Sequence, residues 1–354
     1  MAPSARPRNP IQSRKALPDG TFGDATPIAA AGLARLQALI SDPMTTSGSA
    51  PSGHLPPSGQ QFRLAFDDQV VTVVEVGAAV REFRVGNRDV FQSYAKSAFS
   101  TGFHGAVLVP WPNRLADGRY EFDGEQYQLP ITEPARMTAL HGLSPWRSWR
   151  LVEQQPDRVV LSLALLPSPG FPFFLDTTID YRLAQLGLEV RTTSRNVGHR
   201  ACPYAVGFHP WLSSGEAMLD ECAVTLDATH RFVTDDRLLP VAEEAVAGTP
   251  YDFREPRKLG SLVLDDAFSG VPRTNGRAWV KLAAPDGATA AIWMDESCDY
   301  WQLCTGDMLP AQQARRGLAA EPMTAAPNAF VTGRGLRRLE PGESVRTTWG
   351  ACLL

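Results

Sequence analysis

The sequence predicts an all-β fold of mainly antiparallel strands from residue 61 to residue 354. Short stretches of alternating apolar and polar residues recur at close intervals, and turns rich in Gly, Pro and Asp separate them. No sustained helical period appears in this region, and no internal repeat of fixed length stands out. These observations favour one large sandwich or barrel domain over 61–354 and disfavour a propeller or a solenoid.

Residues 1–60 differ in composition from everything that follows them. They are rich in Pro, Ser, Ala and Gly, and Phe22 is their only aromatic residue. Such a segment buries too little apolar surface to offset its ordering entropy, so we expect a disordered or weakly structured extension. Within it we expect one short helix over 28–40 and a flexible linker over 45–60. Translation from Met44 rather than Met1 is an alternative start, which the intact mass of the native protein would test.

The expected strands are joined by short turns of the kind that connect antiparallel neighbours. Asp123-Gly124, set between two alternating arms, is the strongest of these signals. The expected pairs are 62–66 with 69–76, 119–129, 149–166, 176–196, 279–294 and 338–353, the last of which turns at 340–342.

The composition argues against several classes of function. The net charge is −4 and no basic block alternates with aromatic residues, so we expect no nucleic-acid partner. No apolar run approaches the ~18 residues of a membrane span. The N-terminal arginines lack the apolar stretch of a secretory signal. The five cysteines are scattered without CxxC spacing, which favours buried free thiols in a reducing cytoplasm.

One carboxylate stands out because its neighbours are small or apolar. Glu321 lies in the run Leu318-Ala-Ala-Glu-Pro-Met-Thr324. Burial without a cationic partner raises the pKa of a carboxyl group, which suits a general base that must also return its proton. The alternative is a glutamate at a strand end that pairs with Arg315 or Arg316.

Three further segments place polar groups in rigid or apolar surroundings. His141 lies between apolar residues and a glycine, His209 precedes a proline in YAVGFHPW, and Asn113-Arg114 closes PWPNR. A lone histidine in such a setting is more often a satisfied core residue than a catalyst. Convergence of these segments in the fold would favour catalysis.

The signatures of several other chemistries are missing from the sequence. GxSxG, GxGxxG, GxxxxGK[ST] and HExxH do not occur. His141, His209 and Glu321 form a His₂Glu metal set on paper, but no local ligand pair supports it. Glu321 with Asp265 or Asp266 is a formal carboxylate pair for glycoside hydrolysis. We therefore expect neither a metal nor a cofactor.

The segments PWPNR, ALHG, YAVGFHPW, LDDAF and LAAEPMTAAPNAF resemble those of the aldose 1-epimerase (mutarotase) family and occur in that family's order. HPW and EPMTAAPNAF are most similar to the bacterial aldose 1-epimerase-like branch. The resemblance spans roughly residues 62–354. It implies the galactose-mutarotase-like β-supersandwich, in agreement with the all-β prediction.

The resemblance also implies roles for individual residues. Glu321 falls on the general base that takes the proton of the anomeric hydroxyl, and His209 on the general acid that protonates the ring oxygen. The implied sugar-binding residues are His141, Asn113, Arg114 and Asp265.

Two positions depart from the family pattern. Asp266 stands where a histidine is common, and Trp211 follows His-Pro where Tyr-Phe is frequent. The first departure concerns local hydrogen bonding and the second the wall of the sugar pocket, so both bear on the identity of the substrate more than on the type of reaction.

The predicted function is therefore aldose 1-epimerase activity, the interconversion of the α and β anomers of an aldohexose by acid/base ring opening and closure. One alternative is an epimerase for a phosphorylated or sulfonated hexose, for which Arg136 could supply one charge. Another is a non-catalytic carbohydrate-binding protein on the same scaffold. We expect a small-molecule sugar as the partner, and a monomer or homodimer.

Overall fold

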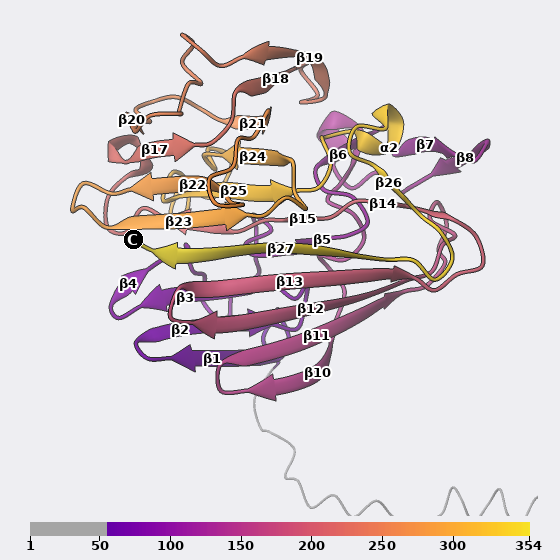
Figure 1. Ribbon diagram of the computed structural model, residues 1–354, viewed down its shortest axis with the longest axis horizontal. Coiled ribbons are helices and arrows are strands. Elements are labelled where there is room, and N and C mark those ends of the chain that lie inside the picture. Colours follow the sequence, from indigo (N-terminus) through magenta and orange to yellow (C-terminus); the bar gives the residue numbers. More distant parts are fainter. Residues whose placement is uncertain (1–54) are drawn as a thin grey trace, which may run out of the picture. The chain divides into compact units, whose positions relative to one another are not determined.

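The computed structural model describes residues 55–354, so the expected helix over 28–40 and the alternative start at Met44 lie outside the described residues. Within 55–354 the regular secondary structure is almost entirely β-strand, as expected (Figure 1). The only helical segments of this part are α2 (Ala329–Thr332) and the short 3₁₀ turns Pro134–Arg136 and Leu219–Glu221. No helix in the same part has the length and apolar character needed to cross a membrane.

Two large sheets dominate the molecule, and every strand pairing of the described residues is antiparallel. In order across the first sheet lie β10 (Arg150–Gln155), β11 (Arg158–Leu165), β12 (Leu175–Ala184), β13 (Gly187–Asn196), β27 (Ser344–Leu353), β23 (Thr289–Met294), β22 (Ala278–Ala283), β17 (Ala223–Leu226) and β20 (Arg257–Lys258). In order across the second lie β19 (Pro240–Ala245), β18 (His230–Thr234), β21 (Asp265–Ser269), β24 (Tyr300–Cys304), β25 (Gly317–Met323), β15 (Gly207–Phe208) and β5 (Val107–Leu108), with β16 (Trp211–Ser213) also on β25.

Smaller sheets complete the fold around these two. They are β1 (Gln61–Phe66), β2 (Gln69–Val74), β3 (Val80–Val85) and β4 (Arg88–Asp89); β6 (Arg114–Ala116) with β9 (Thr138–Leu140); β7 (Arg119–Phe122) with β8 (Glu125–Gln128); and β14 (Cys202–Tyr204) with β26 (Arg337–Leu339).

Five of the six expected hairpins are confirmed: β1–β2, β7–β8, β10–β11, β12–β13 and β22–β23 pair directly. The expectation of a sixth hairpin over 338–353 was wrong. The chain does turn at 340–342, but β26 pairs with β14 whereas β27 inserts between β13 and β23 (Figure 1). Asn196 explains the separation, because its side-chain amide donates to the carbonyl of Leu339 while its backbone N–H donates to Glu343. The turn therefore bends around Asn196 and directs its two arms into different sheets.

The main hydrophobic core lies where side chains of both large sheets meet. Trp349 of β27 packs against Phe208 of β15, with ring centroids 5.3 Å apart. Trp301 and Leu303 of β24 are fully buried in the same cluster. Since β15 and β24 flank β25, this packing fixes the strand that carries Glu321.

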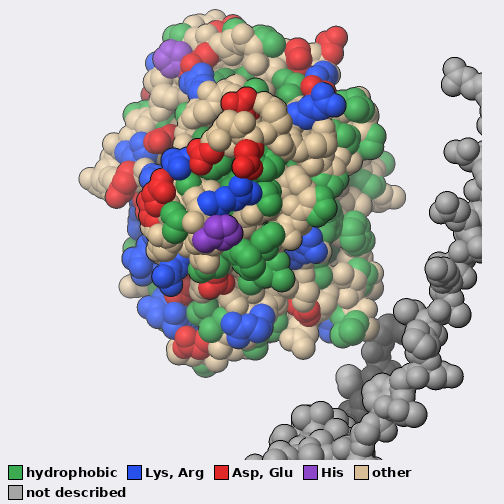
Figure 2. All heavy atoms as spheres, turned by 90° about the vertical axis from the view of Figure 1, so that its right-hand side faces the viewer, with side chains coloured by type: hydrophobic (Ala, Val, Ile, Leu, Met, Phe, Trp, Pro, Cys, Tyr) green, Lys and Arg blue, Asp and Glu red, His purple; other side chains and the backbone are tan. Residues whose placement is uncertain are grey.

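Surface and thiol chemistry agree with the composition. All five cysteines are unpaired and buried, as expected. Acidic and basic side chains lie interspersed on the face shown in Figure 2, where no large area carries one sign of charge.

Candidate active site

The alternation of β25 explains why Glu321 faces a cavity. Leu318 and Ala320 point into the main core, whereas Ala319 and Met323 belong to smaller clusters on the opposite side of the sheet. Side chains along a strand alternate between its two faces, so Glu321 shares the side of Ala319. The buried strand leaves only 2% of Glu321 exposed.

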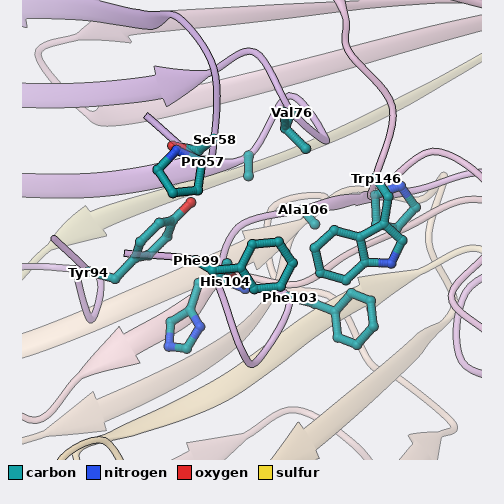
Figure 3. A pocket seen from close by; sticks show the side chains of 12 residues that line it. Pro57, Ser58, Val76, Tyr94, Phe99, Phe103, His104, Ala106 and Trp146 are labelled. Atoms are coloured by element: carbon teal, nitrogen blue, oxygen red, sulfur yellow. Dashed lines mark hydrogen bonds between the residues drawn. The ribbon is translucent and has the colours of Figure 1, made fainter. Parts of the chain in front are cut away.

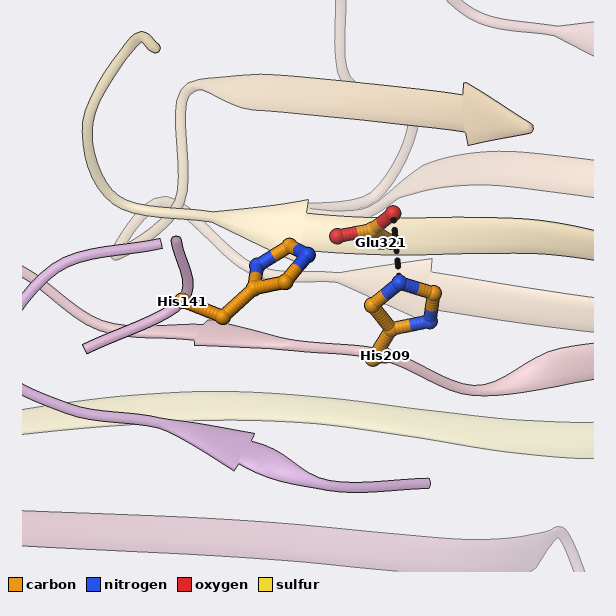
Figure 4. A group of neighbouring side chains, drawn as sticks. All are labelled: His141, His209 and Glu321. Carbon is orange, nitrogen blue, oxygen red and sulfur yellow. Dashed lines mark ion pairs between the residues drawn. The ribbon is translucent and has the colours of Figure 1, made fainter. Parts of the chain in front are cut away.

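Strand register places His209 opposite Glu321. On one side of this position Gly207 pairs with Met323, and on the other Trp211 pairs with Ala319. His209 lies midway between these pairs, and its Nε2 is 3.3 Å from Glu321 Oε1 (Figure 4). Convergence of the two residues, which the sequence could not show, is therefore built into the sheet.

The alternative pairing of Glu321 with an arginine beside it in sequence does not occur. Arg315 instead donates to Asp220 and Asp307, at 2.6 and 3.0 Å, and Arg316 reaches the carbonyl of Glu216. Among residues 55–354, a histidine is thus the only partner within ion-pair distance of Glu321.

Burial moves the pKa values of this pair in opposite directions. Desolvation, with the nearby Asp265 carboxylate, raises the pKa of Glu321 well above its usual value, while Arg114 opposes the shift. Desolvation also lowers the pKa of His209 to about 3. Both shifts favour the uncharged forms, a protonated carboxyl group beside a neutral imidazole. Glu321 Oε2 and His209 Nδ1 are buried and have no hydrogen-bond partner among the described residues.

His141 and Asn113 hold each other in place. The backbone N–H of His141 donates to the carbonyl of Asn113 at 2.9 Å, and the N–H of Asn113 donates to His141 Nδ1 at 3.2 Å. Both residues adopt positive φ angles, 61° and 58°. Because Nδ1 accepts a hydrogen bond, the proton of the neutral ring lies on Nε2, and burial lowers the pKa of His141 well below its usual value. His141 therefore offers an N–H donor to the cavity.

Arg114 links the remaining predicted residues. Its guanidinium donates to Asp265 Oδ2 at 3.1 Å and to both carboxylate oxygens of Glu133, at 2.9 and 3.2 Å. Gln302, which faces Glu321 on the neighbouring strand, donates to Asp265 Oδ1 at 2.6 Å. Sequence reasoning missed both Glu133 and Gln302, because neither stands in a distinctive segment.

All six predicted residues line one cavity. Its lining residues are Thr101, Gly102, Phe103, Asn113, Arg114, Glu133, Arg136, Leu140, His141, His209, Trp211, Asp265, Cys304, Met308, Leu309 and Glu321.

Two aromatic rings stack on the imidazole of His209. Phe103 and Trp211 stack on His209 with centroid distances of 5.9 and 5.8 Å. Trp211, the residue that departs from the family pattern, thus forms a wall of the cavity and donates its indole N–H to the carbonyl of Gly102 at 2.8 Å.

Asp266, the other departure, does not face this cavity. It follows Asp265 on β21, so its side chain lies on the opposite side of the sheet, where it pairs with Arg231. The formal carboxylate pair for glycoside hydrolysis thus retains only Asp265 in the cavity with Glu321.

A second, more apolar pocket adjoins the cavity at Phe103, which lines both (Figure 3). Phe99 and Trp146 stack there with centroids 5.1 Å apart. His104 is its only titratable imidazole, and burial lowers the pKa of His104 to about 4. No carboxylate lines this pocket, so proton-transfer chemistry belongs to the first cavity.

His141, His209 and Glu321 each offer a ligand atom within 4.8 Å of the others. Catalytic zinc sites likewise have three protein ligands. The metal interpretation therefore keeps a geometric basis, and it predicts dependence on a divalent cation. The acid/base interpretation predicts none.

Comparisons with known proteins identify the family of this chain. The aldose 1-epimerase family model matches residues 60–350. The chain is 34% identical over 291 residues to the uncharacterized protein YihR of Escherichia coli K12, which covers 82% of this chain and 92% of that protein. It is 27% identical over 294 residues to the aldose 1-epimerase of the same organism, covering 74% and 81%.

Solved structures share the architecture. The GalM/aldose epimerase homologue from C. elegans aligns with a TM-score of 0.74 at 17% identity, over 83% of this chain and 98% of that one. The likeness confirms the predicted galactose-mutarotase-like fold. Since the family match extends over nearly all the described residues, this chain belongs to the aldose 1-epimerase family and is an isomerase of the mutarotase type.

Proposed function

We propose that the protein interconverts the α and β anomers of an unphosphorylated aldohexose, with Glu321 as the base and His209 as the acid. The main support is the buried pair of Glu321 and His209, whose Oε1 and Nε2 atoms are 3.3 Å apart. This pair faces a cavity that is also lined by the polar groups of Arg114 and Asp265. The five unpaired cysteines suit action in the cytoplasm.

Ring opening requires two proton transfers at neighbouring atoms. The base removes the proton of the C1 hydroxyl, the acid protonates the ring oxygen, and the C1–O5 bond breaks to give an aldehyde. Rotation about C1–C2 followed by the reverse transfers produces the other anomer. Each positioned transfer contributes about 10²–10⁴-fold to the rate.

The protonation state of the free site fits one half of this cycle. When Glu321 has accepted the C1 proton and His209 has given its own to O5, the pair is a neutral acid beside a neutral imidazole. Burial favours the same state in the free site. Ring opening from the closed sugar needs a carboxylate and an imidazolium. In that arrangement the carboxyl proton of Glu321 has moved across the 3.3 Å contact to His209. Hydrogen bonds from sugar hydroxyls to the unpartnered Glu321 Oε2 would favour that move.

The charges of the cavity support a neutral sugar. Arg114 is neutralised by Asp265 and Glu133, and Arg136 donates to Glu133 at 2.9 Å. The lining residues therefore contain no cluster of unpaired cations for a phosphate or sulfonate group. Asp265 and the Nε2–H of His141 provide an acceptor and a donor for hydroxyl groups.

Anomer exchange measured by polarimetry tests the proposal. Freshly dissolved α-glucose or α-galactose should reach its equilibrium rotation faster with the protein than in buffer, by a factor that rises in proportion to protein concentration. Heat-denatured protein serves as the control. A rate equal to that in buffer for every hexose offered would contradict the proposed substrate class.

The phosphorylated or sulfonated hexose is a second candidate, and one observation favours it. Arg136 Nε is buried in the cavity wall without a partner among the described residues. Exchange NMR of the anomeric protons compares the two candidates directly, because it follows glucose and glucose 6-phosphate at equilibrium under the same conditions. Faster exchange of the phosphorylated sugar would favour this second candidate.

Chelation distinguishes the acid/base mechanism from a metal mechanism. We expect dialysis against EDTA to leave the rate of anomer exchange unchanged, because a carboxylate and an imidazole suffice for both proton transfers. Polarimetry before and after dialysis checks this expectation. Loss of activity that added zinc restores would support a cation bound by His141, His209 and Glu321.

A further inference from the structure

Glu133 occupies a central place among the charges of the cavity. Its carboxylate accepts two hydrogen bonds from Arg114, one from Arg136 at 2.9 Å and one from the Thr138 hydroxyl at 2.7 Å. The Glu133 side chain is only 15% exposed and that of Arg114 only 8%. Burial alone would raise the pKa of Glu133, but the hydrogen bonds from Arg114 and Thr138 and the charges of both arginines outweigh it and lower the pKa below its usual value. Glu133 therefore carries a negative charge at neutral pH.

Glu133 holds donor groups that an anionic ligand would otherwise take. The two nitrogens of Arg114 that contact it form a planar fork suited to a carboxylate, a phosphate or a sulfonate. The NH1 group of Arg136 donates to the same carboxylate, while its Nε has no partner among the described residues. Removal of the one negative charge would leave Arg114 paired with Asp265 alone and Arg136 without an acid partner.

We propose that Glu133 is a specificity-determining residue, an internal counter-ion that makes the arginine wall of the cavity select neutral sugars over anionic ones. This inference deepens the proposed function and rests on it for its kinetic test, but not for its binding test. It assigns no proton transfer to Glu133.

The fold supplies a matched control for the effect of charge alone. Asp265 and Asp266 are adjacent on β21, and each pairs with an arginine that also contacts a glutamate. Arg114 binds Asp265 and Glu133, whereas Arg231 binds Asp266 and Glu244 outside the cavity. Glu244→Gln therefore removes the same charge from a similar arrangement at a place where no sugar is expected to bind.

In the binding test, titration calorimetry measures the affinity of the full chain for inorganic phosphate and for sulfate. Glu133→Gln should bind either anion about ten- to a hundredfold more tightly than the wild type, because a charge-assisted hydrogen bond to a freed arginine is worth that much. Glu244→Gln should not differ from the wild type. The double variant Glu133→Gln/Arg136→Gln should lose most of the gain. Equal anion affinity of Glu133→Gln and the wild type would overturn the inference.

The kinetic test measures the selectivity between an anionic and a neutral sugar. A purely structural role of Glu133 would leave this selectivity unchanged. In exchange NMR, the ratio of the kcat/KM values for glucose 6-phosphate and glucose should rise about tenfold or more in Glu133→Gln. Glu133→Asp keeps the charge and should keep the ratio. A parallel fall for both sugars would show that Glu133 only supports Arg114. If no variant exchanges any sugar, the proposed function fails, whereas the anion titration still decides the role of Glu133.

Discussion

Glu321→Gln is expected to lower the rate of anomer exchange by about 10²–10⁴-fold, or roughly 3–5 kcal/mol of barrier, while the fold is retained. Glutamine has the same shape but cannot take a proton from the C1 hydroxyl. Polarimetry on freshly dissolved α-hexose measures the rate. Glu296→Gln, which changes an exposed glutamate, is the control and should behave as wild type.

The same substitution should change stability in a direction opposite to activity. Because the folded-state pKa of Glu321 is raised, the contribution of Glu321 to stability is fully present below the unfolded value near 4.5 and is lost as pH rises toward the folded value. Glutamine has no such dependence. We therefore expect the unfolding temperature of Glu321→Gln to exceed that of the wild type by more at pH 8 than at pH 5. Wild-type exchange rates in this variant would refute the assignment of the base, whatever its stability.

His209→Asn is expected to reduce the rate of anomer exchange by a similar factor, about 10²–10⁴-fold. Asparagine can still donate a hydrogen bond but cannot deliver a proton to the ring oxygen. Since Glu321 and His209 would act together in the same ring-opening step, their effects should not add, and the double variant should be little slower than either single variant. Polarimetry on the three variants measures this.

His199→Asn is the control for the loss of an imidazole, because His199 is exposed and lies outside the cavity lining. A His209→Asn variant with more than a tenth of the wild-type rate would show that another group protonates the ring oxygen. A rate in the double variant equal to the product of the two separate losses would show that the residues act independently.

Local signals in the sequence predicted much of this fold. The hairpin at Asp123-Gly124 was predictable because two residues with the right φ preferences fix the turn, and the pairing follows from it. The turn at 340–342 was predicted as well, but the partners of its arms were not. Those partners depend on Asn196, more than a hundred residues away, and on the packing of Trp349 in the core.

The candidate site likewise has features that local sequence predicted and features that depend on distant residues. The apolar surroundings of Glu321 pointed to a buried carboxylate, and the structure shows one. Its convergence with His209 depends on strand register, which no residue near either position encodes. Glu133 and Gln302 could not be predicted, because a glutamate in a loop and a glutamine in a strand become meaningful only when Arg114 and Asp265 are brought beside them.

The adjacent aspartates of β21 have a consequence for folding errors. A displacement of this strand by one residue along β24 would exchange the two side chains between the faces of the sheet. One of the two arginines would still meet an aspartate, so the acids alone would oppose the displacement only in part. Phe268, however, would leave the main core, and exposing a phenylalanine costs about 1.5–3 kcal/mol. Correct alignment of the acid in the cavity is thus enforced by an aromatic ring three positions further along the strand.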